Sequence, residues 1–356
     1  MTDPILLYGA TGFTANLVID EMLRQGLHPV LSARNPDALR ARAERAGLLY
    51  RPAKLDQPGS LKTALDGMQV MLNLAGPYRT TSQRAIEACL ETGVHYLDVS
   101  GEVDAVAEAA RLHPEARARG VMLMPGAGFD VVPSDCLCAH VAKRLRDIQT
   151  LRIAVSGLDL ASSGSLRTLA YELGRPTRVC HGGTLRELPP GELTRRFDFG
   201  DGLRPCAAVS WADLITAPIT TGASNVETYF ESTPTVAAFV QYNRQLGWVH
   251  RLPWADKWLD LPRPFGTNGP TAEQRALRRA TIVVQGEDSA GRSFSSTLST
   301  PEVYSLTAQT ATSIAARVLA GDTEPGFQTP ARLFGADFIL RFSGVTRTDN
   351  EAKSGS

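Results

Sequence analysis

The chain has 356 residues, of which 43% are hydrophobic, and its 37 basic and 37 acidic side chains leave no net charge. This length exceeds one typical domain, so two domains are expected. A chain without net charge is not attracted as a whole to nucleic acid or to an acidic membrane surface.

The sequence shows no pattern of export or membrane insertion. Residues 1–4 are not a basic region followed by an apolar run, and no stretch of about 18 apolar residues occurs. The five cysteines are scattered, and Cys136 and Cys138 lack the two-residue gap of common zinc pairs. We therefore predict a cytoplasmic protein with buried, reduced cysteines and no metal.

A strand, a glycine turn and a helix follow one another at the N-terminal end. Residues 5–8 are apolar, the pattern Gly9-x-x-Gly12-x-x-Ala15 comes next, and apolar residues then recur at helical spacing. In this order Gly9 permits a tight turn, Gly12 lets the backbone approach a pyrophosphate, and Ala15 lets the helix pack closely. The alternative is an ordinary turn that requires glycine. We predict a dinucleotide site formed by Gly9, Ala10, Thr11, Gly12, Phe13 and Thr14.

The alternation of strands and helices continues to about residue 124. Apolar runs predict further strands at 28–33, 48–50, 70–75, 95–99 and 121–124. Helical patterns lie between them at 36–46, 60–65, 82–93 and 103–119. Such alternation predicts a Rossmann-type, doubly wound parallel sheet whose ligand lies at the carboxyl ends of the strands.

From about residue 150 the pattern becomes that of an α+β domain. Alternating polar and apolar residues predict largely antiparallel strands at 151–155, 194–199, 225–230 and 281–285, with helices at 162–173 and 304–319. We predict three parts: a dinucleotide-binding domain over 1–130, an α+β substrate and dimerisation domain over 131–325, and a C-terminal segment, 326–348, that returns to the first domain.

The end of the second predicted strand distinguishes NADP from NAD. Arg34 stands where an acid would bind the ribose 2′-hydroxyl, and a guanidinium there suits a 2′-phosphate, with Ser32 as a further donor. An exposed arginine before an Asn-Pro turn is the alternative. Asp56, after the third predicted strand, is placed to contact adenine or to cap the next helix. We predict NADP, and NADPH in its reduced form, as the cofactor.

Two more turns follow predicted strands at the same edge of the sheet. Ala75, Gly76 and Pro77 come after the strand at 70–75, and Ser100, Gly101 and Glu102 come after the strand at 95–99. Carboxyl-end turns lie beside the middle and the nicotinamide end of a bound dinucleotide. We predict that all six contact the cofactor, although simple turns and helix caps would use the same residues.

These motifs together resemble the saccharopine dehydrogenase-like oxidoreductases. The resemblance rests on residues 9–15, 73–78, 98–102 and 125–134, and residues 164–168, 181–184 and 326–331 are similar to the branch of trans-acting enoyl reductases. It implies NADP(H)-linked reduction in a protein that is often a homodimer. It implies a polyketide- or lipid-like double bond as substrate in the enoyl branch, or an amino-acid imine in the saccharopine branch. The arginine pair that would hold an amino-acid carboxylate is not evident here.

Hydride transfer also needs a proton donor beside the nicotinamide. Tyr78, on the turn after the strand at 70–75, is one catalytic candidate, and a ring packed against the cofactor is the alternative. Asp130 is the other candidate, because the chain leaves the sixth predicted strand there. Asp130 or Ser134 capping the next helix is the alternative for this segment.

A tryptophan-rich stretch at 239–258 gives three readings: a mouth for a long acyl chain, a peripheral membrane contact, or a dimer surface. The leading prediction is an NADP(H)-dependent oxidoreductase that reduces a C=C bond of an apolar, acyl- or polyketide-like small molecule. The alternatives are an imine-reducing amino-acid dehydrogenase and a non-catalytic NADP-binding sensor or scaffold. We expect no nucleic-acid partner and a homodimer.

Overall fold

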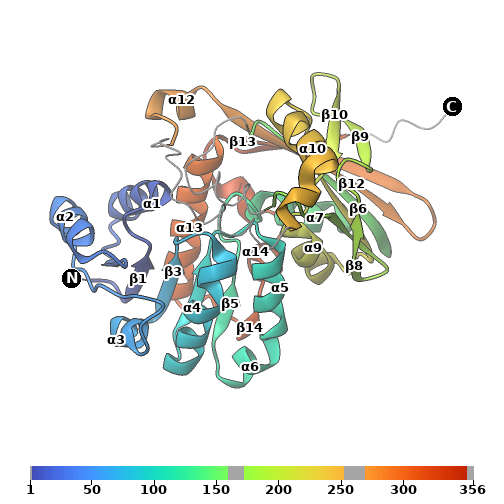
Figure 1. The fold of residues 1–356 in the computed structure, drawn as a ribbon. Coiled ribbons are helices and arrows are strands. Elements are labelled where there is room, and N and C mark those ends of the chain that lie inside the picture. Colours follow the sequence, from blue (N-terminus) through green and yellow to red (C-terminus); the bar gives the residue numbers. More distant parts are fainter. Residues whose placement is uncertain (1, 159–171, 252–268, 351–356) are drawn as a thin grey trace. The chain divides into compact units, whose positions relative to one another are not determined.

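The computed structural model describes residues 2–158, 172–251 and 269–350. The chain divides into two compact units, each described here by itself (Figure 1). The first contains Met1–Val132 and Tyr304–Gly335, and the second contains Pro133–Val303 and Ala336–Ser356. Within the described ranges, no helix is both long and apolar enough to cross a membrane.

The first unit contains a six-stranded sheet in which all pairings are parallel. Its strands, in the order β14-β5-β4-β3-β1-β2, are β1 (Ile5–Tyr8), β2 (Val30–Ser32), β3 (Val70–Asn73), β4 (His95–Asp98), β5 (Met122–Met124) and β14 (Gly326–Phe327). The strands are buried because helices cover a parallel sheet on both faces, which explains their continuous apolar runs. The prediction of a Rossmann-type sheet is confirmed.

The helices of this unit connect the strands. They are α1 (Phe13–Arg24), α2 (Pro36–Ala46), α3 (Ser60–Leu65), α4 (Tyr78–Thr92), α5 (Val103–Arg111), α6 (His113–Ala118), α13 (Val303–Leu319) and α14 (Pro330–Phe334). In Figure 1, α4 and α5 lie on the viewer's side of the sheet. The crossovers therefore produce the layered arrangement expected of a doubly wound fold.

The predicted strand at 48–50 is wrong. This segment forms a single parallel bridge between Tyr50 and Leu31, and Leu49 is 62% exposed. The Leu31 N–H donates to the Leu49 carbonyl and the Arg51 N–H to the Leu31 carbonyl, so only one residue pair is formed. The Ala53 N–H also donates to the Ala33 carbonyl at 3.2 Å, but no second residue pair is formed.

The division into units differs from the predicted domain boundaries in the C-terminal part of the chain. Helix α13 belongs to the first unit, where the Phe129 N–H donates to the Thr307 hydroxyl at 3.0 Å. Strand β14 pairs with β5, and the Phe327 N–H donates to His113 Nδ1 at 3.0 Å. The segment predicted to return to the first domain does so only as far as Gly335.

The second unit is built on a nine-stranded, mostly antiparallel sheet. Its main path is β15-β13-β12-β6-β11-β10-β9, with β7 paired to β11 and β8 paired to β7. The strands are β6 (Ile148–Ser156), β7 (Thr177–His181), β8 (Thr184–Leu188), β9 (Thr194–Asp198), β10 (Leu203–Ala208), β11 (Asn225–Glu231), β12 (Arg279–Asp288), β13 (Ser293–Pro301) and β15 (Thr346–Asn350). The helical elements are α7 (Val132–Ala142), α9 (Asp213–Thr221), α10 (Pro234–Leu246), η1 (Gly247–Arg251), α12 (Ala272–Ala276) and η2 (Phe338–Arg341). This confirms the predicted α+β unit, while the predicted helix at 162–173 lies almost wholly outside the described residues.

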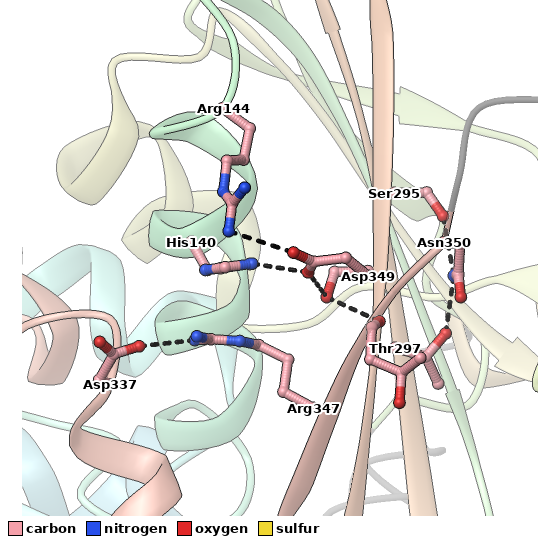
Figure 2. A network of polar contacts seen from close by, with 10 residues as sticks. His140, Arg144, Ser295, Thr297, Asp337, Arg347, Asp349 and Asn350 are labelled. Carbon is pink, nitrogen blue, oxygen red and sulfur yellow. Dashed lines mark hydrogen bonds and ion pairs between the residues drawn. The ribbon is translucent and has the colours of Figure 1, made fainter.

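The edge strand β15 is attached to its unit by charged side chains as well as by pairing with β13 (Figure 2). Asp349 accepts from the Ser296 hydroxyl at 2.9 Å and contacts His140 Nε2 at 2.7 Å and Arg144 at 3.2 Å. Burial raises the pKa of Asp349, but hydrogen bonds and positive charges around it outweigh this, so its pKa is lowered overall.

Replacing Asp349 by Asn should lower the free energy of unfolding at pH 7 by roughly 0.5–1 kcal/mol. The effect is small because the contacts of Asp349 with His140 and Arg144 are partly exposed and screened by solvent. A carboxylate with a lowered folded-state pKa stabilises above its unfolded value of about 3.9 and loses this effect as the pH falls through the folded value. Urea unfolding of both proteins from pH 7 to pH 3 should therefore show the difference shrinking below about pH 4. A difference independent of pH would contradict this.

Candidate functional site

The first unit places its predicted ligand turn where the strand order reverses. From β1 the chain continues to β2 on one side, while β3, β4 and β5 follow on the other. In folds of this kind ligands bind beyond the carboxyl ends of the strands at such a switch point, here the ends of β1 and β3. The turns after these strands abut: a Cβ on Gly9 would lie 2.7 Å from Ala75 N and 2.8 Å from the Leu74 carbonyl carbon. Gly9 also has a φ of +84°, so the sequence requires glycine there for two reasons.

The turn is held by its backbone and leads into an uncapped helix. The N–H groups of Gly9 and Ala10 both donate to the Ser32 carbonyl, and the Gly12 N–H donates to the Gly9 carbonyl. Gly12 is the N-cap residue of α1, which has no side-chain cap and no acid in its first turn. The helix therefore presents backbone donors and the positive end of its dipole to an anion. Beside them the Phe13 ring packs edge-on against Tyr304, with centroids 5.1 Å apart.

Of the predicted adenosine-side residues, Ser32 and Arg34 lie at the end of β2, and Asp56 lies between α2 and α3. Arg34 and Asp56 are both exposed. Burial raises the pKa of the Tyr8 hydroxyl, the Arg34 charge opposes this rise and the Asp56 charge adds to it, so both side chains lie near that hydroxyl. Gly59 is the N-cap residue of α3, without a side-chain cap, so the alternative role of Asp56 as a cap is not observed. Asn35, next to Arg34, caps α2.

Ser32 differs from its predicted role in one respect. Its side chain is fully buried, and Oγ has no hydrogen-bond partner in the part of the chain that the structure describes. Its carbonyl positions the glycine turn through Gly9 and Ala10. A contact between its hydroxyl and a 2′-phosphate stays a prediction, whereas the cradle at Gly9 and the uncapped α1 fit a dinucleotide diphosphate.

A buried polar chain joins the loops that follow β3, β4 and β5. Asn73 Nδ2 donates to the Tyr96 hydroxyl at 3.1 Å, and this hydroxyl donates to Asp98 Oδ2 at 2.7 Å. Asp98 Oδ1 accepts from the N–H groups of Ser100 at 2.9 Å and Gly126 at 3.0 Å. The Ala75 N–H donates to Asn73 Oδ1, which completes the connection between the three loops. Burial raises the pKa of Asp98 to about 6, despite the opposing hydrogen bonds.

Glu102 links the second of these loops to α4. One carboxylate oxygen accepts from the Tyr78 N–H and the other from the Arg79 N–H, each at 2.9 Å. The Glu102 N–H in turn donates to Ser100 Oγ at 3.0 Å. Glu102 therefore caps a helix that is distant in sequence, which satisfies backbone donors and complements the helix dipole. These hydrogen bonds lie within the protein, whereas Ser100, Gly101 and Glu102 were expected to contact the cofactor. Those cofactor contacts stay predictions.

The two catalytic candidates lie within the influence of the same carboxyl groups. Tyr78 is buried, and burial first, then the charges of Asp98, Glu102 and Asp130, raise its pKa well above the usual range. A phenol in that state stays protonated and is a weak acid. Burial, followed by the charges of Glu102 and Asp98, raises the pKa of Asp130 to about 7. Asp130 is therefore the better matched to proton donation near neutral pH.

The segment that carries Asp130 is packed tightly into the first unit. A Cβ on Gly128 would lie 2.9 Å from Thr307 Cγ2 and 3.0 Å from Val99 Cβ. The neighbouring Ala127 N–H donates to the Asp98 carbonyl at 2.6 Å. These contacts fix the approach of the chain to Asp130.

Gly76 and Pro77 precede α4, and the Thr81 hydroxyl donates to the Ala75 carbonyl at 2.6 Å.

Sequence reasoning missed the organising role of Asn73, Tyr96 and Asp98. A signal existed, because Asn73 and Asp98 are polar residues that end otherwise apolar strands. It also missed Gln328, which follows β14 and is 1% exposed. In the described part of the chain, no cluster of three or more His, Cys, Asp or Glu residues is placed to hold a metal ion.

The fold and site define a Rossmann-type dinucleotide-binding domain. Residues 5–124 match the family model of the saccharopine dehydrogenase NADP binding domain. The predicted resemblance and the predicted cofactor, NADP, are both confirmed by this match.

Curated relatives carry oxidoreductase names. A trans-acting enoyl reductase of Mycobacterium ulcerans is 31% identical over 179 residues, which cover 46% of this chain and 43% of the relative. A saccharopine dehydrogenase-like oxidoreductase of Homo sapiens is 33% identical over 152 residues, which cover 37% of this chain and 35% of the relative. The chain thus matches less than half the length of these relatives.

Two solved structures share the fold over nearly the whole chain. Saccharopine dehydrogenase (L-Glu forming) of Saccharomyces cerevisiae has a TM-score of 0.64 and 14% identity, covering 97% of this chain and 99% of the other. The homospermidine synthase of Legionella pneumophila, in complex with NAD, has a TM-score of 0.66 and 10% identity, covering 100% and 94%. At these identities the likeness concerns the fold alone.

Replacing Tyr96 by Phe should destabilise the protein, because it leaves both the Asn73 amide and an Asp98 oxygen without the hydroxyl they share. Each unsatisfied buried group costs about 1–3 kcal/mol, and a drop in melting temperature should reveal this. Tyr50→Phe is a suitable control, since the Tyr50 hydroxyl contacts only the exposed Arg40 side chain. Equal melting temperatures for the two variants would show that the hydrogen bonds from Asn73 through Tyr96 to Asp98 do not stabilise the protein.

Proposed function

We propose that this protein is an NADP(H)-dependent reductase. The carrying observation is the Gly9 cradle and the uncapped α1, in a domain that matches the NADP-binding family model. In the same unit, burial and the charges of Glu102 and Asp98 raise the pKa of Asp130 to about 7. An aspartate with such a pKa retains a proton near neutral pH and can donate it, whereas an ordinary aspartate is fully ionised there. The names of the curated relatives support the same class of reaction.

In the proposed mechanism the cofactor, when bound, supplies a hydride to an electrophilic carbon of the substrate. The turn from Gly9 to Thr14 binds the diphosphate, and Arg34 binds the 2′-phosphate. The loops at 75–77 and 100–102, held by the Asn73–Tyr96–Asp98 chain, border the nicotinamide half. Asp130 delivers a proton to the atom that becomes negatively charged. Tyr78 packs beside them as a neutral ring.

For the substrate we propose a conjugated C=C bond of an apolar, acyl- or polyketide-like molecule. The name of the M. ulcerans relative supports this choice. Trp248, on η1, is 61% exposed and is offered as part of an apolar mouth. Trp254 and Trp258, the other tryptophans of this stretch, lie outside the described residues. An amino-acid imine, which the resemblance to the saccharopine branch implies, is the second candidate. A cytoplasmic homodimer is part of the same proposal.

Replacing Arg34 by Ser should weaken NADPH binding by roughly tenfold or more and leave NADH binding nearly unchanged, because only NADPH carries the phosphate that the guanidinium would pair with. Fluorescence titration of the purified protein with each nucleotide measures this. An equal loss for both nucleotides would mean that Arg34 acts on the turn as a whole. Wild-type protein that binds neither nucleotide would overturn the proposed function.

A substrate is first found by screening enoyl and imino compounds for NADPH oxidation, and an enoyl thioester is expected. With that substrate, Asp130→Asn should lower kcat/KM about a hundredfold. The wild-type rate should fall as the pH rises through about 7, since the protonated form of Asp130 is the active one. The variant should lack this decline. Tyr78→Phe is the control, and it should keep the pH profile. If Tyr78→Phe abolished the profile and Asp130→Asn preserved it, the two roles would be reversed.

A further inference from the structure

Gln328 is a buried amide that the first unit does not satisfy. It is 1% exposed, and neither its Nε2 nor its Oε1 has a hydrogen-bond partner among the described residues. Burying an amide without partners costs at least about 1–3 kcal/mol, so such groups are rare in folded proteins. A donor and an acceptor on one side chain, both without a partner among the described residues, indicate that a group beyond those residues completes them.

The backbone places Gln328 at the ligand edge of the sheet. Strand β14 runs parallel to β5, with Phe327 opposite Leu123, and the Gln328 N–H donates to the Leu123 carbonyl at 2.9 Å. Gln328 is therefore level with Met124, the last residue of β5, where the chain turns into the loop that leads to Asp130. Neighbouring strands are about 4.8 Å apart, so Gln328 begins one strand spacing from that loop.

The strand order also relates Gln328 to the dinucleotide turn. Between β1 and β14 lie β3, β4 and β5, so the two strands are separated by four spacings, roughly 19 Å. A dinucleotide whose diphosphate lies at α1 extends its nicotinamide half across the ends of these strands. The far end of that half carries a carboxamide, which has the same adjacent donor and acceptor as the Gln328 side chain.

We infer that the Gln328 amide binds the carboxamide of the nicotinamide ring. This rests on the proposed function, because it takes NADP(H) as the ligand. Its Nε2 donates to the carboxamide oxygen, and its Oε1 accepts from the carboxamide nitrogen. Pairing at this point fixes the rotation of the ring about its bond to ribose, which decides the face of C4 presented to the substrate. Gln328 is therefore assigned as a cofactor-orienting residue.

The test compares ligands with and without the nicotinamide ring. Gln328→Met keeps the length of the side chain and removes both polar atoms. It should bind NADPH roughly 3- to 10-fold more weakly, as expected for the loss of one or two hydrogen bonds. It should bind 2′-phospho-ADP-ribose, which lacks the ring, as wild type does. The unliganded variant should melt at the same temperature or higher, since an unsatisfied amide has been replaced by an apolar group of similar shape.

Thr312→Val is the matched control, because Thr312 is also fully buried and its Oγ1 has no partner in the described chain. It should resemble Gln328→Met in thermal stability and wild type in NADPH affinity. Unchanged NADPH affinity in Gln328→Met would overturn the inference, and an accompanying rise in KM for the organic substrate would assign the amide to substrate instead. Should the methionine variant fold poorly, Gln328→Leu, which also removes both polar atoms, replaces it under the same criteria. Wild-type protein that binds neither ligand would refute the proposed function itself.

Discussion

The site depends on the hydrogen bonds that the buried carboxylate of Asp98 accepts. Through Tyr96 it connects to Asn73, and through its other oxygen it accepts from the backbone of two further loops. Loops at the carboxyl ends of parallel strands share no ladder hydrogen bonds, so each would otherwise be positioned only by its own strand. One acceptor that three segments share converts separate turns into a single rigid rim. Glu102 adds a fourth connection, to the first turn of α4.

The same arrangement gives the site its acid–base character. Asp98 and Glu102 carry their charges in a region that excludes water, and backbone donors compensate for much of that cost. A third carboxyl group nearby, Asp130, then meets both burial and two like charges, which favour its neutral form. The residues that hold the rim together thus also hold a proton on the proposed donor. A substitution of Asp98 or Glu102 would therefore change both the positions of the loops and the pKa of Asp130.

Much of the first unit could be predicted, because its determinants are local. The run at 5–8, the glycine spacing and the helical repeat after it define β1, the turn and α1 within 24 residues of sequence. The strand at 48–50 was wrong because three apolar residues before a proline look like a strand, whatever they pair with. The helix α13 was predicted, but a helical pattern does not state which unit it packs on. Glu102 capping α4 and the Tyr96 bridge depend on contacts 23 or 24 positions apart, which periodicity does not reveal.

Strand β14 has a consequence for how the molecule is made. The sheet of the nucleotide-binding unit receives its sixth strand from residues 326–327, about two hundred positions after β5. During synthesis, β5 is therefore an unpaired edge while residues 133–303 of the second unit emerge from the ribosome, and unpaired edges invite pairing with other chains. The chain crosses between the units at 132–133, 303–304 and 335–336, so the second unit is tethered at both ends of its long segment. The sheet of the nucleotide-binding unit is thereby completed only after most of the second unit has been made, and β15 of the second unit follows it.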